Sequence, residues 1–118
     1  MSGTGGSGGE PLNISCAEAQ RRLRQGATLI HVREHPEVAR GMVPGSVHLP
    51  LAVLGADPAA ALRHAGIDPG LREVLCICAS GGRSQMAAHA LRQAGARAAS
   101  VIGGVAAWAA SGLPFGQR

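Results

Sequence analysis

The residues best able to do chemistry in this chain form one short loop that starts at a cysteine. Cys78 closes an apolar run, and the residues that follow are Ala79, Ser80, Gly81, Gly82, Arg83 and Ser84, the last of which opens a helix-forming stretch. In such a strand–loop–helix unit, the N–H groups of the loop and of the first helical turn point at the cysteine sulfur and form a concave anion site. This setting favours thiolate over thiol, and Arg83 adds a fixed positive charge at the rim. The loop predicts a nucleophilic cysteine that handles small anions.

Short apolar runs and helix-forming stretches alternate around this loop. We expect strands over residues 28–32, 47–49, 73–77 and 98–102. Helices are predicted over residues 16–25 with Ser15 as N-cap, over 34–40, in two pieces within 51–65, and over 84–94 and 105–110. This alternation is typical of an α/β domain with a mainly parallel sheet. Ligands of such sheets bind beyond the carboxyl ends of the strands, and Cys78 lies at one of these ends.

The composition fits one globular domain that follows a flexible tail. Of the 118 residues, 46% are hydrophobic and 15% are charged, which argues against a disordered chain. Residues 1–11 read as a Gly/Ser-rich tail and residues 12–116 as the domain. No apolar run is long enough to cross a membrane, and residues 1–9 lack the basic and apolar regions of a signal peptide.

The charged residues and the cysteines narrow the range of partners. Eleven arginines and no lysine give a net charge of +4, but this charge is spread along the chain, and the aromatic residues are one Trp and one Phe. Nucleic-acid binding would need a basic stripe or stacking aromatics, so we expect none. Three cysteines without metal-ligand spacing favour neither a disulfide scaffold nor a metal site, and they fit a reducing cytoplasm. We expect no metal, no cofactor and a monomer.

Three segments, in order along the chain, carry a resemblance to a known family. Residues 29–34 and 41–46, LIHVRE and GMVPGS, resemble the LIDVRE…GHIPGA signature of rhodanese-like sulfurtransferase domains. Residues 78–84, CASGGRS, are similar to the CRSGNRS active-site loop of that family, and residues 101–114 to its GG…AW…GLP ending. The resemblance runs over residues 12–115. It implies a three-layer α/β/α domain whose mainly parallel central sheet has about five strands.

The resemblance also implies a covalent mechanism centred on Cys78. Its thiolate would attack the outer sulfur of a small anionic donor, such as thiosulfate or a polysulfide, and become a persulfide. The persulfide sulfur would then pass to cyanide, to a small thiol or to a protein acceptor. The N–H groups of residues 79–84 would hold the anionic sulfur, and Arg83 would reach the donor or steady the loop. Ser84 would cap the following helix or hydrogen-bond the persulfide.

The chain departs from the family pattern at several positions. His31 stands where the family has Asp, Met42 where it has His, and Ala79 where it often has a charged residue. The His31 imidazole either contributes to the site or is a core histidine bonded to backbone. Arg33 either adds to the substrate field or pairs with its neighbour Glu34.

Three further side chains have structural interpretations. Cys76 should pack in the core, because it lies two residues before Cys78 in the same strand. Cys16 should be packed or exposed on the first helix, and Trp108 should anchor the last helix to the core.

The sequence leaves two other functions open. The first is a sulfur-relay or docking module that takes persulfide sulfur from a partner protein and has little activity alone. The second is a cysteine phosphatase or arsenate reductase, because phosphatases of this fold also use a cysteine loop that ends in arginine. Four residues separate Cys78 from Arg83, whereas the phosphatase loop has five and forms a wider cradle for phosphate.

Overall fold

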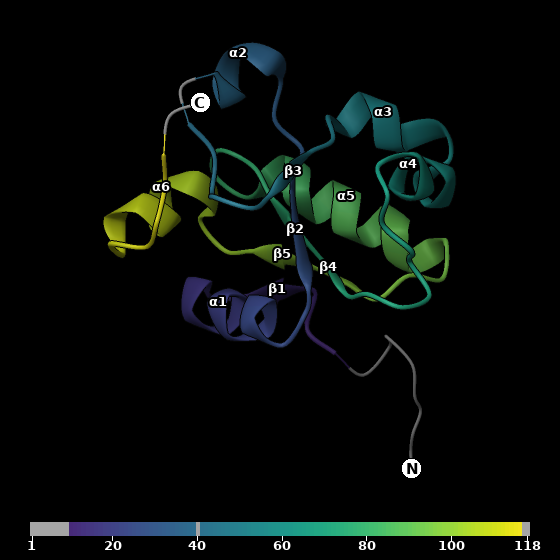
Figure 1. Cartoon of the computed structure of the whole chain (residues 1–118), viewed down its shortest axis with the longest axis horizontal. Coiled ribbons are helices and arrows are strands. Elements are labelled where there is room, and N and C mark those ends of the chain that lie inside the picture. Colours follow the sequence, from purple (N-terminus) through teal and green to yellow (C-terminus); the bar gives the residue numbers. More distant parts are fainter. Residues whose placement is uncertain (1–9, 40, 117–118) are drawn as a thin grey trace.

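A computed structural model describes residues 10–39 and 41–116, and it places five parallel strands between two layers of helices (Figure 1). The strands are β1 (Asn13–Ile14), β2 (Thr28–His31), β3 (Val47–His48), β4 (Val74–Ile77) and β5 (Ala98–Val101). The helices are α1 (Cys16–Arg24), α2 (His35–Val38), α3 (Leu51–Ala56), α4 (Pro58–His64), α5 (Gly82–Gln93) and α6 (Gly104–Ala110). The strand order is β1-β5-β4-β2-β3, and every pairing is parallel. The predicted three-layer architecture with about five strands is confirmed.

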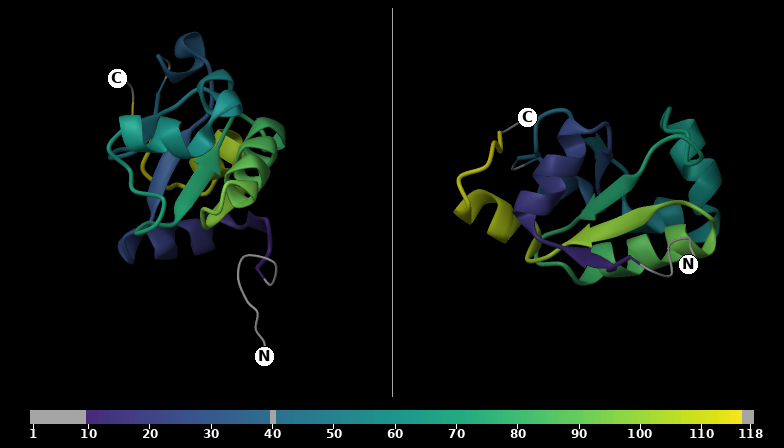
Figure 2. Two further views of the ribbon diagram at one scale, coloured as in Figure 1. Left: turned by 90° about the vertical axis from the view of Figure 1, so that its right-hand side faces the viewer. Right: turned by 90° about the horizontal axis from the view of Figure 1, so that it is seen from below.

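Figure 2 shows helices on both sides of the strands. Two apolar clusters hold these layers together, one on each face of the sheet. Leu75 and Ile77 of β4 pack on the face that α1 and α6 cover, whereas Val74 and Cys76 pack on the face of α3, α4 and α5. All four residues are fully buried. A parallel strand covered on both faces needs no polar side, which explains the continuous apolar run in the sequence. The prediction that Cys76 packs in the core is confirmed.

The helix signals in the sequence correspond to real caps. The Ser15 side chain accepts a hydrogen bond from the Glu18 N–H at 3.0 Å and begins α1 as predicted. The predicted break within residues 51–65 falls at Asp57, whose carboxylate accepts from the Ala60 N–H and caps α4. Trp108 is 1% exposed and donates its indole N–H to the Pro114 carbonyl, so it anchors α6 as expected.

Three elements differ from the sequence-based prediction. Helix α5 begins at Gly82 and not at residue 84, because Gly81 is its N-cap. The helix predicted over residues 34–40 is the single turn α2, because Glu34 lies before it: the Glu34 N–H donates to the Glu37 carboxylate, and the Glu34 carbonyl accepts from Val38. Position 40 and the tail residues 1–9 lie outside the described residues. Strand β1 was not predicted as a separate strand. The position of β1 is fixed by β5, because the backbone N–H of Ser100 donates to the Leu12 carbonyl and that of Ile102 donates to the Ile14 carbonyl.

No helix in residues 10–39 and 41–116 combines the length and the apolar character that crossing a bilayer requires.

Candidate active site

Cys78 lies at the floor of a cradle made by the loop between β4 and α5. Its side chain is buried, and its Sγ accepts hydrogen bonds from the Gly81 N–H at 3.0 Å and the Ser84 N–H at 3.4 Å. Gly81 is the N-cap of α5 and has φ +119°, a left-handed conformation that side-chain-bearing residues rarely adopt. The sequence therefore turns sharply here and aims the first turn of α5 at the sulfur, as predicted.

The N-terminus of α6 fixes the orientation of the cysteine loop. The Val105 N–H donates to the Cys78 carbonyl at 2.7 Å, and the Ala106 N–H donates to the Ala79 carbonyl at 3.2 Å. In a trans peptide the N–H points opposite to the C=O. With these carbonyls held by α6, the N–H groups of Ala79 and Ser80 face away from α6.

Gly104 allows this close approach between α6 and the cysteine loop. A Cβ at position 104 would contact the Cys78 carbonyl oxygen and come within 2.7 Å of the Ala79 carbonyl oxygen. Gly104 also has φ +59°, in the left-handed region. The glycine pair that ends β5 is therefore part of the architecture of the cysteine loop.

These contacts favour a thiolate at Cys78. Burial acts to raise the pKa of the thiol, but the hydrogen bond between the thiol and the Ser84 side chain, together with those from the backbone N–H groups of Ser84, Gly81 and Ser80, outweighs it, so the pKa of Cys78 is lowered. The other two cysteines behave in the opposite way. Burial raises the pKa of Cys16, and burial together with the negative charge of Cys78 raises the pKa of Cys76. Cys78 is thus the thiol best suited to act as a nucleophile.

A buried pair of serines supports the cradle from behind. The Ser84 Oγ lies 3.6 Å from the Cys78 Sγ, donates to the Gly81 carbonyl at 3.0 Å, and lies 2.7 Å from the Ser100 Oγ. Ser84 and Ser100 are both fully buried. Sequence reasoning missed Ser100. The signal for it was a hydroxyl in the otherwise apolar run of β5, where a buried polar side chain needs a partner.

Arg83, Glu37 and Arg33 form a charged group beside the cradle. Both terminal nitrogens of Arg83 donate to the Glu37 carboxylate, at 2.6 and 2.7 Å. Arg33 is 6% exposed and donates to the carbonyls of Gly41 and Glu37, and its Nε has no partner among the described residues. The alternative of a pair with Glu34 is wrong for Arg33, because its hydrogen bonds go to these carbonyls.

The Arg83–Glu37 pair connects α2 with the start of α5. It holds the pKa of Glu37 at about 2, mainly through the hydrogen bonds from Arg83. In this structure Arg83 therefore steadies the loop. Glu37 is a second residue that sequence reasoning missed, since no local pattern links positions 46 residues apart.

His31 is a core histidine bonded to backbone. Its imidazole is fully buried, and its Nε2 accepts a hydrogen bond from the Val43 N–H at 3.2 Å. The imidazole thus holds the 43–46 turn to the end of β2. Met42, the neighbouring departure from the family pattern, is buried and forms a backbone bridge with Gly116.

Of the predicted site residues, the structure gathers Cys78, Gly81 and Ser84 directly around the sulfur. Ala79 and Ser80 contribute backbone, while Gly82 opens α5 and the Arg83 side chain points to Glu37. Among residues 10–39 and 41–116, no group of three His, Cys, Asp or Glu side chains could hold a metal ion.

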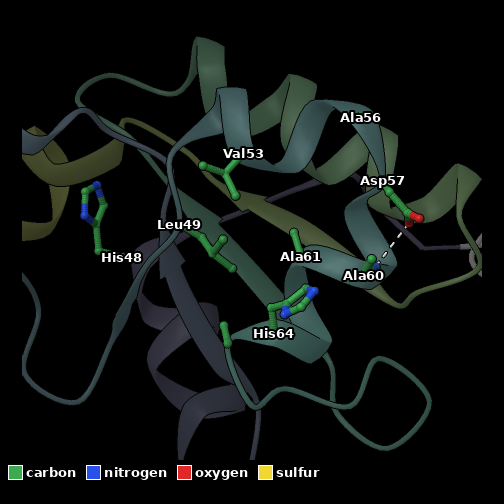
Figure 3. A pocket seen from close by; sticks show the side chains of 9 residues that line it. His48, Leu49, Val53, Ala56, Asp57, Ala60, Ala61 and His64 are labelled. Atoms are coloured by element: carbon green, nitrogen blue, oxygen red, sulfur yellow. Dashed lines mark hydrogen bonds between the residues drawn. The ribbon is translucent and has the colours of Figure 1, made fainter.

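A separate hollow of about 430 Å³ lies beside α3 and α4 (Figure 3). Its walls include Leu49, Val53 and Ala61, and His48 lines it as well. Asp57 at its edge already caps α4 through Ala60. The hollow contains no cysteine, so the candidate chemistry of this chain belongs to the Cys78 loop.

The chain is similar to known proteins over most of its length. The family model described as "Rhodanese-like domain" matches residues 15–111. A protein of Allochromatium vinosum named sulfurtransferase is 36% identical over 88 residues, which is 74% of this chain and 76% of that protein. The putative sulfurtransferase YtwF of Bacillus subtilis is 36% identical over 80 residues, 68% of this chain and 71% of that protein.

The fold also matches solved structures. The crystal structure of a rhodanese-related protein from Thermoplasma volcanium superimposes with a TM-score of 0.77 and 25% identity, covering 90% of this chain and 98% of that chain. With a match over residues 15–111 and these relatives, the chain belongs to the rhodanese-like domain family.

Proposed function

We propose that this protein is a sulfurtransferase that moves sulfane sulfur from a small anionic donor to a thiophilic acceptor through a persulfide on Cys78. The observation that carries the proposal is the Cys78 sulfur held by the Gly81 and Ser84 N–H groups, with a lowered pKa in spite of burial. The names of the two curated relatives support the same class of reaction.

The proposed reaction has two balanced steps. The Cys78 thiolate attacks the outer sulfur of thiosulfate, the S–S bond of the donor breaks, and sulfite leaves with the bonding electron pair. The carbon of cyanide, or the sulfur of an acceptor thiolate, then attacks the outer sulfur of the persulfide. The new S–S bond breaks, and its electron pair returns to Cys78 as thiolate. The cradle N–H groups stabilise the negative sulfur in both steps.

A second candidate is a relay module that receives sulfur from a persulfide on a partner protein. The Arg83–Glu37 pair favours it, because the guanidinium nearest the loop is already bound to a carboxylate. An inorganic dianion then meets less positive charge than the sequence suggests, whereas a persulfide donor, which carries at most one negative charge, depends less on that charge.

Several wider expectations stay proposals. We propose a monomer, with residues 12–116 as the domain and residues 1–11 as its tail. We also propose a cytoplasmic location, because all three cysteines are free thiols. Polysulfides and thiosulfate are the proposed small donors, and cyanide, small thiols and a protein thiol the proposed acceptors.

Single-turnover kinetics test the function and separate the two candidates. The protein is loaded with thiosulfate in one arm and with a persulfidated protein in the other, and discharge to cyanide is followed as thiocyanate. The direct sulfurtransferase predicts loading in both arms, and the relay module predicts rapid loading only from the protein donor. Cys78→Ser should abolish both, while the matched variant Cys16→Ser should keep both. Thiocyanate formation by Cys78→Ser at the wild-type rate would overturn the proposal.

A further inference from the structure

Three arginines from distant parts of the chain line one hollow at the foot of the sheet, the edge formed by the amino ends of the strands. Its volume is about 200 Å³, and its lining includes Arg22, Gly26, Ala27, Arg72, Glu73 and Arg97. Ala27, Glu73 and Arg97 immediately precede β2, β4 and β5. The hollow therefore lies at the amino ends of the strands, on the far side of the sheet from Cys78, which follows the carboxyl end of β4.

The backbone brings these side chains together. The Thr28 N–H donates to the Glu73 carbonyl and the Val74 N–H to the Arg97 carbonyl, both at 2.9 Å, so the first residues of three strands stay in register. Arg22 comes from the last turn of α1. Five residue steps of about 3.3 Å separate Glu73 from Cys78, a distance of roughly 17 Å along β4.

The three arginines differ in how many of their side-chain N–H groups already donate hydrogen bonds within the protein. Arg22 is anchored: its Nε donates to Glu18 at 2.7 Å and its Nη1 to Glu73 at 2.6 Å, and its side chain is 17% exposed. Arg72 uses one nitrogen, Nη1, on the Gly26 carbonyl at 3.0 Å. The Arg97 side chain has no hydrogen-bond or ion-pair partner among residues 10–39 and 41–116.

The positive charge of the lining is only partly balanced. Arg22 pairs with Glu73 and Glu18 and lies 3.8 Å from Glu10, whereas the charges of Arg72 and Arg97 have no carboxylate partner among the described residues. Stabilising the C-terminus of α1 does not account for this excess, because the Arg22 carbonyl already accepts from the N–H groups of Gln25 and Ala27. Arginines with unused donors around a concave surface match the geometry of an oxyanion, which accepts paired N–H groups.

We propose that this hollow binds a small doubly charged oxyanion of the sulfate, phosphate or thiosulfate type. The volume is close to that of six or seven water molecules at about 30 Å³ each, which accommodates one tetrahedral anion and a few waters. A dianion neutralises the excess charge and joins α1, β4 and β5 at the foot of the sheet. The site goes beyond the proposed sulfur transfer and does not rest on it.

Backbone amide chemical shifts in the Cys78→Ser protein test the proposal, since that protein cannot be loaded with sulfur. Sodium sulfate, phosphate and thiosulfate are each titrated at constant ionic strength, with sodium chloride making up the difference. We expect saturable shifts at Gly26, Ala27 and Glu73 with all three dianions. The spread among their affinities identifies the preferred anion.

Arginine variants locate the binding. Arg97→Gln and Arg72→Gln should each weaken sulfate binding by roughly threefold to tenfold, as expected for losing one partly screened charged hydrogen bond. Arg63→Gln, an exposed arginine of α4 outside the hollow, is the matched control and should leave the affinity unchanged. In an otherwise wild-type chain, Arg97→Gln should also leave thiosulfate turnover unchanged.

Two results would overturn the proposal. One is sulfate-induced shifts confined to residues 79–84, which would assign all anion binding to the Cys78 cradle. The other is shifts at the foot of the sheet that persist unchanged in both Arg97→Gln and Arg72→Gln. A failure of sulfur transfer with retained sulfate shifts at Gly26 and Ala27 would refute the proposed function and leave this site standing.

Discussion

Acidification should destabilise this protein through a single buried imidazole. The Val43 N–H donates to the Nε2 of His31, so the neutral ring carries its proton on Nδ1, which has no partner among the described residues. A proton on Nε2 would break this hydrogen bond and place two donors against each other in the core. Burial, with smaller effects from Arg33 and His48, accordingly lowers the pKa of His31 from 6.5 to about 4.

The direction and size of the effect follow from linkage between proton binding and folding. Between pH 6.5 and about 4 the unfolded chain binds a proton at His31 and the folded chain does not, so the free energy of unfolding falls as pH falls through this window. At about 1.4 kcal/mol per pH unit, the loss reaches about 3 kcal/mol at pH 4. This stability is fully present above pH 6.5.

Urea unfolding of the wild type and His31→Asn from pH 7.5 to 4 measures the effect. Asn removes the titrating ring and keeps a side-chain acceptor, so the difference in the free energy of unfolding should shrink by about 3 kcal/mol as pH falls. His64→Asn, an exposed histidine of α4, is the matched control and should follow the wild type. A wild-type curve parallel to that of His31→Asn across this pH range would refute the reasoning.

Three further predictions concern the cradle. Ser84→Ala should raise the pKa of Cys78 and slow its alkylation by iodoacetamide at pH 7 by about threefold to tenfold, while Ser80→Ala keeps the backbone N–H and the wild-type rate; equal rates would contradict the role of Ser84. Glu37→Gln should release Arg83 and lower the KM for thiosulfate about twofold to fivefold, an effect that salt weakens. Glu34→Gln, which removes a neighbouring charge without breaking that pair, should change KM less, and a KM for Glu37→Gln no lower than that of Glu34→Gln would argue against a released Arg83. Gly104→Ala should reduce the free energy of unfolding by at least about 3 kcal/mol, because its Cβ meets the Ala79 carbonyl at positive φ. Gly112→Ala, with positive φ but open space around it, should cost about 1 kcal/mol in the same denaturation experiment, and equal losses would show that the contact is relieved.

Local patterns predicted most of the fold. Four of the five strands were visible as apolar runs, and the Ser15 and Asp57 caps place helix starts where short side chains accept backbone N–H groups. Strand β1 was missed because two residues cannot show a period of two. Its place depends on pairing with β5, 87 residues away, which no local pattern contains.

The sequence predicted which backbone segment forms the site, but it did not predict which distant side chains contact that segment. The cysteine, the glycines and the start of α5 form one continuous segment, so their chemistry follows from adjacency. Arg83 meets Glu37 and Ser84 meets Ser100 only through tertiary packing. Position 31 also could not be interpreted from sequence alone. An imidazole in place of the family's carboxylate suggested a change at the active site, but the ring accepts a hydrogen bond from the Val43 backbone N–H.

Intact-mass spectrometry after exposure to thiosulfate tests the central claim most directly. The account predicts a gain of one sulfur atom, about 32 Da, on the wild type and none on Cys78→Ser, and release of that mass by cyanide as thiocyanate. The same gain on Cys78→Ser, or no gain on a folded wild type whose Cys78 is reduced after either thiosulfate or polysulfide, would contradict sulfur transfer through this cysteine.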